Sequence, residues 1–175
     1  MNIAFELDLD KINLTDEQFF QLCQNNPDMR FERTASGELI IMSPTGSITS
    51  DRNADLTCQL RNWNRKYKLG KSFDSSGGFK LPNGAERSPD ASWVKMERWN
   101  SLTKEEQERF APLCPDFVAE LMSPSDTLEK TRAKMKEYME NGAALGWLIN
   151  RKQKQVEIYR LNEKVEILES PQTVS

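Results

Sequence analysis

Two carboxylates stand at predicted ends of buried strands, where they could do chemistry. Glu120 lies within residues 117–122, an otherwise apolar run, and Asp90 directly follows a proline at the start of residues 90–95. An unpaired carboxylate in a buried strand costs several kcal/mol or is forced neutral, so Glu120 needs a partner. Two such carboxylates on adjacent strands can hold Mg²⁺, which activates a bound water against a phosphodiester. A buried ion pair at Glu120 and an ordinary turn at Asp90 are the structural alternatives.

Other chemistries are excluded by composition. The 175 residues include no histidine, which excludes Ser-His-Asp and Cys-His catalysis and His-ligated zinc. Cys23, Cys58 and Cys114 lie far apart, so neither a zinc ribbon nor a disulfide framework is indicated. Any reaction must therefore depend on carboxylates, lysines, hydroxyls and a hard metal ion with oxygen ligands.

The length and hydropathy bound the class of protein. A chain of 175 residues fits one domain, which we expect to span residues 1–175 with its core over about 50–162. Mean hydropathy is −0.70, and no apolar run approaches the roughly 18 residues of a membrane span. Residues 1–8 lack the basic start and apolar stretch of a signal peptide, so we expect a cytoplasmic location.

The elements that must position the two carboxylates follow from hydrophobic periodicity and turn residues. They indicate a mixed α/β fold in which helices flank a central sheet, with an N-terminal helix and a β-hairpin. We expect helices over 15–26 (N-cap Thr15), 50–68 and from an Asp126 capping box to Gly142, a helical excursion over 96–115, a hairpin of 29–34 and 38–42 followed by a loop from Ser43, strands over 72–81, 90–95, 117–122, 145–150, 155–161 and 164–168, and a polar tail over 170–175.

Charge is unevenly distributed along the chain. Residues 1–50 contain eight acidic and three basic side chains, whereas residues 51–71 contain six basic and two acidic ones. The second stretch falls on the predicted helix 50–68, whose polar face carries Arg61, Arg65 and Lys66, with Lys68 at its end. Such a stretch could follow a phosphate backbone, although a solvated helix face explains it as well. The net charge of −3 argues against a protein that coats nucleic acid non-specifically.

Several motifs together carry a family resemblance. They are GELIIMSPTG (37–46), SPDAS (88–92), VAELMSPSD (118–126), Lys134 to Gly142 and WLIN (147–150). Pro89-Asp90 and a strand with Glu120 are similar to the PD-(D/E)XK nuclease superfamily, although Met122 stands where that motif has its lysine. The fuller pattern, over about residues 15 to 162, resembles the Uma-type (Uma two) family of restriction-endonuclease-like proteins.

The resemblance implies a role for further residues. In that family the lysine is placed on the helix after the acidic strand, which corresponds to Lys134; an ordinary surface lysine is the alternative. Glu38 corresponds to an acid that would join the site from the hairpin, or is an exposed strand charge. Ser123 and Ser125 would contact a phosphate near the helix start, or would cap the helix. The histidine that many members have after the Pro-Thr-Gly turn is absent here.

The resemblance and the residues together imply a metal-dependent endonuclease with a restriction-endonuclease-like core. It would use Mg²⁺ or Mn²⁺ on Asp90 and Glu120 to cut nucleic acid, with DNA the expected substrate, and Lys134 would orient the attacking water. A homodimer is expected, because two copies often cut two strands. Two rival hypotheses remain at this point: a nuclease fold with little or no catalysis that binds nucleic acid, and a protein-interaction module that binds a partner through an exposed Trp99 or Trp147 and the last strands.

Overall fold

The structure, a computed structural model, describes residues 5–7, 14–42 and 44–174. Its elements in chain order are β1 (Phe5–Leu7), α1 (Asp16–Asn25), β2 (Arg30–Arg33), β3 (Leu39–Met42), α2 (Ser47–Tyr67), β4 (Gly70–Asp74), β5 (Phe79–Lys80), β6 (Glu86–Arg87), β7 (Ala91–Lys95), α3 (Met96–Asn100), α4 (Lys104–Glu108), β8 (Phe117–Leu121), α5 (Leu128–Glu140), β9 (Leu145–Asn150), β10 (Gln155–Arg160) and β11 (Glu166–Glu169). Predictions that involved residues 1–4, Asp8, Ser43 and Ser175 fall outside the described part.

The larger sheet carries the predicted acids. It has six strands in the order β11-β10-β9-β8-β7-β4. Strands β8 and β9 are parallel, and every other neighbouring pair is antiparallel. The chain passes from β8 to β9 through α5, as a parallel connection requires. The predicted mixed α/β architecture is confirmed.

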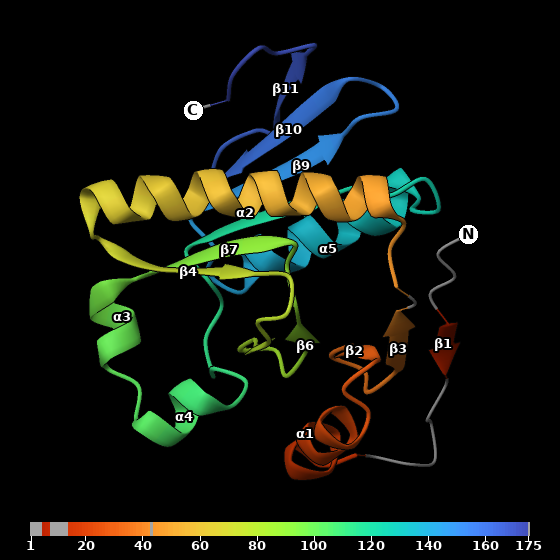
Figure 1. The fold of residues 1–175 in the computed structure, drawn as a ribbon, viewed down its shortest axis with the longest axis vertical. Helices are drawn as coiled ribbons and strands as arrows, with labels where there is room; N and C mark the ends of the chain where they lie inside the picture. Colours follow the sequence, from red (N-terminus) through yellow and green to blue (C-terminus); the bar gives the residue numbers. More distant parts are fainter. Residues whose placement is uncertain (1–4, 8–13, 43, 175) are drawn as a thin grey trace.

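Helices α2 and α5 cover opposite faces of this sheet (Figure 1). On one face, Trp93 of β7 donates its indole N–H to Asn64 of α2 at 2.8 Å. The next residue, Val94, lies on the other face in the main apolar core, together with Met135 and Tyr138 of α5. Side chains of a strand alternate between faces, so each helix packs against its own set of strand residues.

The predicted hairpin is part of a second sheet. β2 and β3 pair as expected, and β1, β6 and β5 extend them into a five-stranded antiparallel sheet of order β1-β3-β2-β6-β5. Helix α1, capped by Thr15, buries Phe19 against Phe31 and Leu39 of this smaller sheet. Strand β1 is a feature that the sequence reasoning missed.

Several local predictions were wrong. Residues 72–81 form β4 and β5, which lie in different sheets, because Asp74 accepts hydrogen bonds from the backbone and hydroxyl of Ser76 and turns the chain. Thr127, rather than Asp126, caps α5 by accepting from the backbone N–H of Lys130. The predicted helical excursion over 96–115 is confirmed, since it contains two short helices, α3 and α4.

Helix α2 is confirmed, and its apolar stripe is partly buried. Leu56 and Leu60 are half-buried, whereas Trp63 and Tyr67 remain 41% and 49% exposed. Polar residues also face the sheet: Asn64 is buried and binds the carbonyl of Gly70, and Asn53 binds Asp90. Apolar spacing identified the helix correctly but not these polar contacts. Among the described residues, no helix is long and apolar enough to cross a membrane.

Candidate active site

The two predicted acids lie on neighbouring strands. Ala91 of β7 pairs with Ala119 of β8 in antiparallel register. Asp90 directly precedes Ala91, and Glu120 directly follows Ala119, so the two carboxylates occupy opposing positions at the same end of the strand pair. The sheet therefore brings together two acids that are 30 positions apart in the sequence.

Both carboxylate oxygens of Asp90 accept hydrogen bonds. Oδ2 accepts the backbone N–H of Leu121 at 2.8 Å, and Oδ1 accepts the side-chain amide of Asn53 at 3.0 Å. Burial nevertheless raises the pKa of Asp90 above its ordinary value, and the N–H of Leu121 and the charge of Lys134 offset this in part. The carboxylate is thus oriented rigidly in a place where negative charge is costly.

Glu120 is buried and has the partner that its position requires. Its Oε1 accepts the hydroxyl of Tyr138 at 3.0 Å and lies 2.9 Å from the ammonium of Lys134. Burial raises the pKa of Glu120 to about 7, even though Lys134 lowers it, and the nearby carboxylates of Asp90 and Glu32 raise it further. A cation that approached this pair of acids would relieve that cost.

Lys134 lies at the centre of a charged cluster that it forms with Asp90, Glu120 and Glu32. The side chain comes from α5, is 19% exposed, and places Nζ 2.8 Å from Glu32 as well as 2.9 Å from Glu120. Burial alone would lower the pKa of Lys134, but the two carboxylates raise it above its ordinary value. The lysine is therefore charged and fixed between two acids, and it is not a solvated surface residue.

The sequence analysis missed Glu32, the third acid. It lies on β2 of the smaller sheet and is 3% exposed. Its carboxylate accepts Lys134, Arg87 at 3.1 Å and the backbone N–H of Ser88 at 2.9 Å. Burial would raise the pKa of Glu32, but Lys134 and Arg87 hold it below its ordinary value. The sequence offered little signal, because Glu32 is one of three charged residues in the four-residue strand Arg30–Arg33.

Glu38, the hairpin acid implied by the resemblance, lies elsewhere. It is exposed and accepts the hydroxyls of Thr34 and Ser36, both at 3.2 Å, within its own turn. The hairpin does send an acid into the cluster, but that acid is Glu32. Ser123 and Ser125 lie before α5, where their hydroxyls bond each other at 3.0 Å. They do not cap the helix, since Thr127 does.

The donor set fits a hard divalent ion with few protein ligands. Within residues 5–7, 14–42 and 44–174, no group of three or more acidic or cysteine side chains is placed to hold a metal. Asp90 and Glu120 supply two carboxylates, and Mg²⁺ commonly takes one or two and keeps several waters. The cluster is short of positive charge, because Asp90, Glu120 and Glu32 share Lys134 and an arginine that also pairs with Glu137 at 2.6 Å.

Comparison with known proteins assigns the chain to a family. Residues 16–175 match the model of the Uma2 family, whose description is "Putative restriction endonuclease". The chain belongs to the Uma2 family. A crystal structure titled as a putative nuclease belonging to DUF820, from Anabaena variabilis, has the same fold at 20% identity, with a TM-score of 0.72 over 93% of this chain and 88% of that one. No curated protein matches the sequence.

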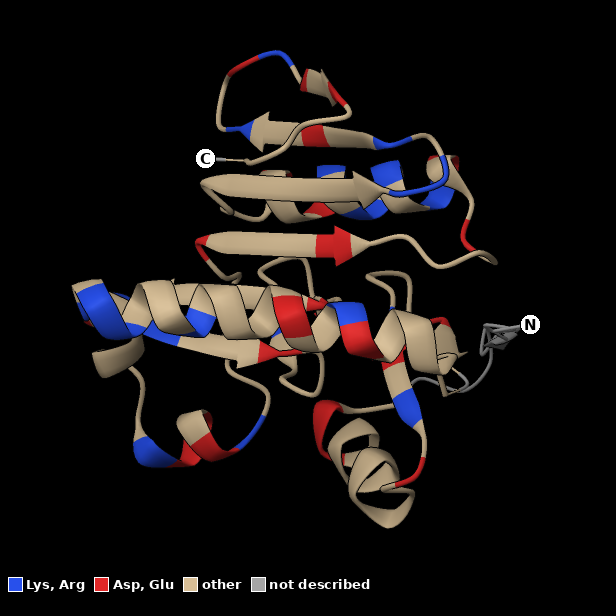
Figure 2. Ribbon diagram, turned by 45° about the horizontal axis from the view of Figure 1, so that its top comes forward, with Lys and Arg blue, Asp and Glu red and all other residues tan. Residues whose placement is uncertain are grey.

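The four basic residues of this Uma2 chain that the sequence predicts to contact nucleic acid fall into two groups. Arg61 and Arg65 line an open pocket of about 590 Å³ between α2 and the turn after β4. Lys66 lies over the ring of Tyr67, 5.1 Å from its centroid, and Lys68 ends the helix in a left-handed conformation. Neither lysine lines the described pocket. Figure 2 shows basic residues along both α2 and α5, although the molecule is acidic overall.

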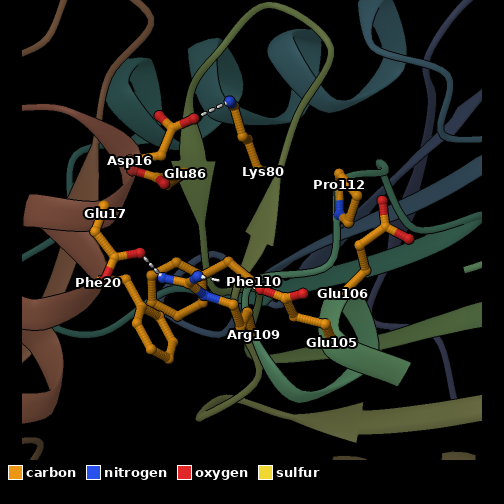
Figure 3. Close-up of a pocket in the computed structure, with 10 residues that line it drawn as sticks. All are labelled: Asp16, Glu17, Phe20, Lys80, Glu86, Glu105, Glu106, Arg109, Phe110 and Pro112. Atoms are coloured by element: carbon orange, nitrogen blue, oxygen red, sulfur yellow. Dashed lines mark hydrogen bonds and ion pairs between the residues drawn. The ribbon is translucent and has the colours of Figure 1, made fainter. Parts of the chain in front are cut away.

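A second pocket of the Uma2 chain, of about 420 Å³, contains none of the predicted residues (Figure 3). Helix α1 contributes Asp16 and Glu17, which pair with Lys80 and Arg109. Glu86 of β6 lines the same pocket and is almost fully buried beside Arg33. These pairs tie α1 to β5 and to the segment after α4, so we interpret this pocket as structural.

Proposed function

We propose that this Uma2-family protein is a metal-dependent endonuclease that hydrolyses phosphodiester bonds of nucleic acid, with DNA as its substrate. The observation that carries the proposal is the convergence of Asp90, Glu120 and Lys134 from two strands and one helix. Family membership and the nuclease-like fold support the reaction class. Two acids and a lysine are the groups that metal-assisted hydrolysis of a phosphodiester needs.

In this proposal Asp90 and Glu120 hold one Mg²⁺ or Mn²⁺. The ion supplies polarisation of the phosphoryl oxygens and a bound water of lowered pKa. Asn53 and the backbone N–H of Leu121 keep the Asp90 carboxylate in one orientation, and Tyr138 does the same for Glu120. Pre-oriented ligands spare the site the entropic cost of ordering them at each turnover.

Lys134 orients the attacking water and offsets the negative charge that develops on the phosphate. Its ammonium stays protonated because two carboxylates surround it. Glu32 is a positioning residue, since it pairs with the same ammonium of Lys134 as Glu120 does. We assign to Glu32 the supporting role that the resemblance implies for Glu38. Ser123 and Ser125, whose loop joins β8 to α5, are proposed phosphate contacts.

Calorimetric titration of Mn²⁺ tests the metal site without a known substrate. The wild type is expected to bind saturably, and Glu120→Gln is expected to lose that binding with an unchanged circular dichroism spectrum. Glu38→Gln is the matched control, because it removes an exposed glutamate of the hairpin and should leave binding intact. Absence of wild-type binding at millimolar Mn²⁺ would refute the metal site and leave Glu120 as one partner of a buried ion pair.

One observation favours an alternative, a nuclease fold that only binds nucleic acid. In the described structure Lys134 pairs with both Glu32 and Glu120, so the cluster already exists as an ion-pair network without a metal ion. Affinity for DNA that is equal with Mn²⁺ and with EDTA, and that Glu120→Gln leaves unchanged, would support this alternative. A metal-dependent cleavage product would contradict it.

We further propose a homodimer and a cytoplasmic location. Trp63, Tyr67 and Leu69 form an exposed apolar surface, 41–56% accessible, which a second copy could cover. Analytical ultracentrifugation should give twice the chain mass for the wild type and the mass of one chain for Trp63→Glu. A wild type with the mass of one chain would contradict the dimer.

Three unpaired cysteines fit a reducing compartment such as the cytoplasm.

A further inference from the structure

The pocket beside α2 is a groove with a defined lining. One face of the helix supplies Ser50, Asn53, Thr57, Arg61 and Arg65, which recur every three or four residues. Opposite this face lie Arg30 of β2 and the turn after β4. The helix face from Ser50 to Arg65 is about 22 Å long at 1.5 Å per residue. The groove is therefore long and open, which suits a chain better than a compact ligand.

The charges of the groove converge from separate elements. Arg30 comes from the smaller sheet, and Arg61 and Arg65 come from α2. The guanidinium of Arg61 is oriented by Ser72, whose hydroxyl it meets at 3.3 Å. Asp74 is the single acid of the lining, and Ser76 and both nearby arginines keep its pKa low. The groove thus carries three positive charges against one negative in a protein of net charge −3.

The groove reaches the proposed catalytic cluster through Asn53. This residue lines the groove, and its side-chain amide donates to Asp90 at 3.0 Å. Its Oδ1 is buried and has no hydrogen-bond partner in the described structure. Arg30 is near enough to Asp90 to lower the pKa of that carboxyl. A ligand bound along the groove would consequently pass beside the acids.

We propose that this groove binds the sugar-phosphate backbone of the DNA on one side of the bond to be cut, with Arg30, Arg61 and Arg65 contacting phosphates. The inference rests on the proposed function and adds the path of the substrate. Arginine forks bind phosphate oxygens in pairs, and the serine and threonine hydroxyls of the lining add neutral donors. Lys66 and Lys68 lie outside the groove and do not contribute.

The salt dependence of binding tests the three arginines. A fluorescein-labelled 20-bp duplex is titrated with the Glu120→Gln protein, which cannot cut it, at several KCl concentrations. Each lost phosphate contact reduces the slope of log Kd against log salt by about 0.9. Replacing Arg30, Arg61 and Arg65 by Gln together should reduce the slope by about 2 to 3 and weaken binding at least roughly tenfold.

The matched control removes the same charge nearby. Lys66, Lys68 and Lys71 are all exposed, and none of them lines the groove. Replacing all three lysines by Gln should leave the salt slope and the Kd close to those of the parent, which is the Glu120→Gln protein. Equal losses in the two triple variants would overturn the inference, because they would show that only the overall charge matters. A parent without affinity for the duplex would overturn it too.

A second test blocks the groove without changing its charge. Cys58 is exposed and lines the groove, whereas burial raises the pKa of Cys23 to about 11 and of Cys114 to about 12, so a maleimide should label Cys58. A bulky label there should abolish duplex binding. The control carries Cys58→Ser and Gln59→Cys, which moves the label about 100° around the helix. Equal duplex binding by the two labelled proteins would overturn the proposal that the DNA lies in this groove.

Failure of this inference can be distinguished from failure of the hydrolytic function. Mn²⁺ binding that depends on Glu120, together with duplex binding that ignores the arginines, refutes the groove and keeps the metal site. Duplex binding that depends on the arginines, without any Mn²⁺ binding, keeps the groove and refutes metal-dependent hydrolysis.

Discussion

Glu32 connects three cationic or donor groups that belong to different elements. Lys134 comes from α5, Arg87 from β6, and the N–H of Ser88 from the segment before β7. The carboxylate is almost fully buried, so each ion pair is shielded from solvent. Removing one partner of a buried pair leaves the other charge uncompensated, which is more costly than the pair is stabilising.

We therefore expect Glu32→Gln to lower the free energy of unfolding by about 3 kcal/mol. Urea denaturation measures this as a lower midpoint at an unchanged slope. Glu38→Gln makes the same chemical change at an exposed position of the same hairpin and should stay within about 0.5 kcal/mol of the wild type. Similar midpoints for the two variants would contradict the assignment of Glu32 to the cluster.

Lys134 is expected to act on the rate more than on metal binding. Replacing it by Gln removes the charge beside Glu120 but leaves both carboxylates of the proposed metal site. Single-turnover cleavage at saturating Mn²⁺ should fall by roughly 10²-fold or more, with Mn²⁺ still bound. Lys136→Gln is the control, because that side chain is 74% exposed and pairs with Glu140. Equal rates for Lys134→Gln and wild type would eliminate the proposed role.

At the scale of elements, the sequence predicted what local patterns determine. Apolar spacing and Thr15 identified α1 and α2, and the alternation around Glu120 identified β8. The sheet to which a strand belongs depends on contacts far along the chain. Residues 72–81 were predicted as one strand although Asp74-Ser-Ser-Gly-Gly78 is a local turn signal, and β4 and β5 lie in different sheets.

The same limit applies to the candidate site. Asp90, Glu120 and Lys134 were predicted from their motifs, and the structure brings these three together. Glu32 was missed because only the pairing of β2 with β6 carries it to the larger sheet. Glu38 was chosen because it matched a family position, but its side chain stays within its own turn.

The junction of α2, β4 and β7 has no space for a side chain at Gly70. A Cβ there would lie 2.1 Å from the carbonyl oxygen of Val94 and 2.5 Å from the ring of Trp93. Gly70→Ala should therefore destabilise the fold by about 3 kcal/mol, measured by urea denaturation. Gly46→Ala, at the N-cap of α2, meets nothing within 4 Å and should cost no more than about 1 kcal/mol, the penalty of Ala at an N-cap. Equal stability of both variants would show that the junction relaxes freely.

On the scale of the whole molecule, the cluster of Glu32, Glu120 and Lys134 lies where the two sheets meet. Glu32 belongs to the smaller sheet, Glu120 to the larger sheet, and Lys134 to the helix that covers the larger one. The pair Arg87–Glu137 links the same two parts. The elements therefore hold the cluster rigidly from three sides, and its charges contribute to the stability of the entire fold.

Glu86 and Glu120 predict how stability depends on pH. Burial raises the pKa of each to about 7, from an ordinary value of 4.5. Between pH 4.5 and 7 the folded protein retains protons at these groups that the unfolded chain has released. Stability therefore falls as pH rises through this window and levels off above it. Groups whose pKa is lowered in the folded protein, such as Asp16 and Glu32, stabilise the fold throughout this window and lose that stabilising effect only as the pH falls below it.

Glu86 separates this effect from the proposed metal site, since it lines the pocket of Figure 3 instead. Glu86→Gln cannot ionise, so the wild type should lose stability relative to this variant by up to about 3 kcal/mol between pH 4.5 and 7. Urea midpoints across that range measure the difference. Glu105→Gln, at an 81% exposed rim position, should give a curve parallel to wild type. A Glu86→Gln curve that is also parallel would mean that Arg33 keeps Glu86 ionised throughout.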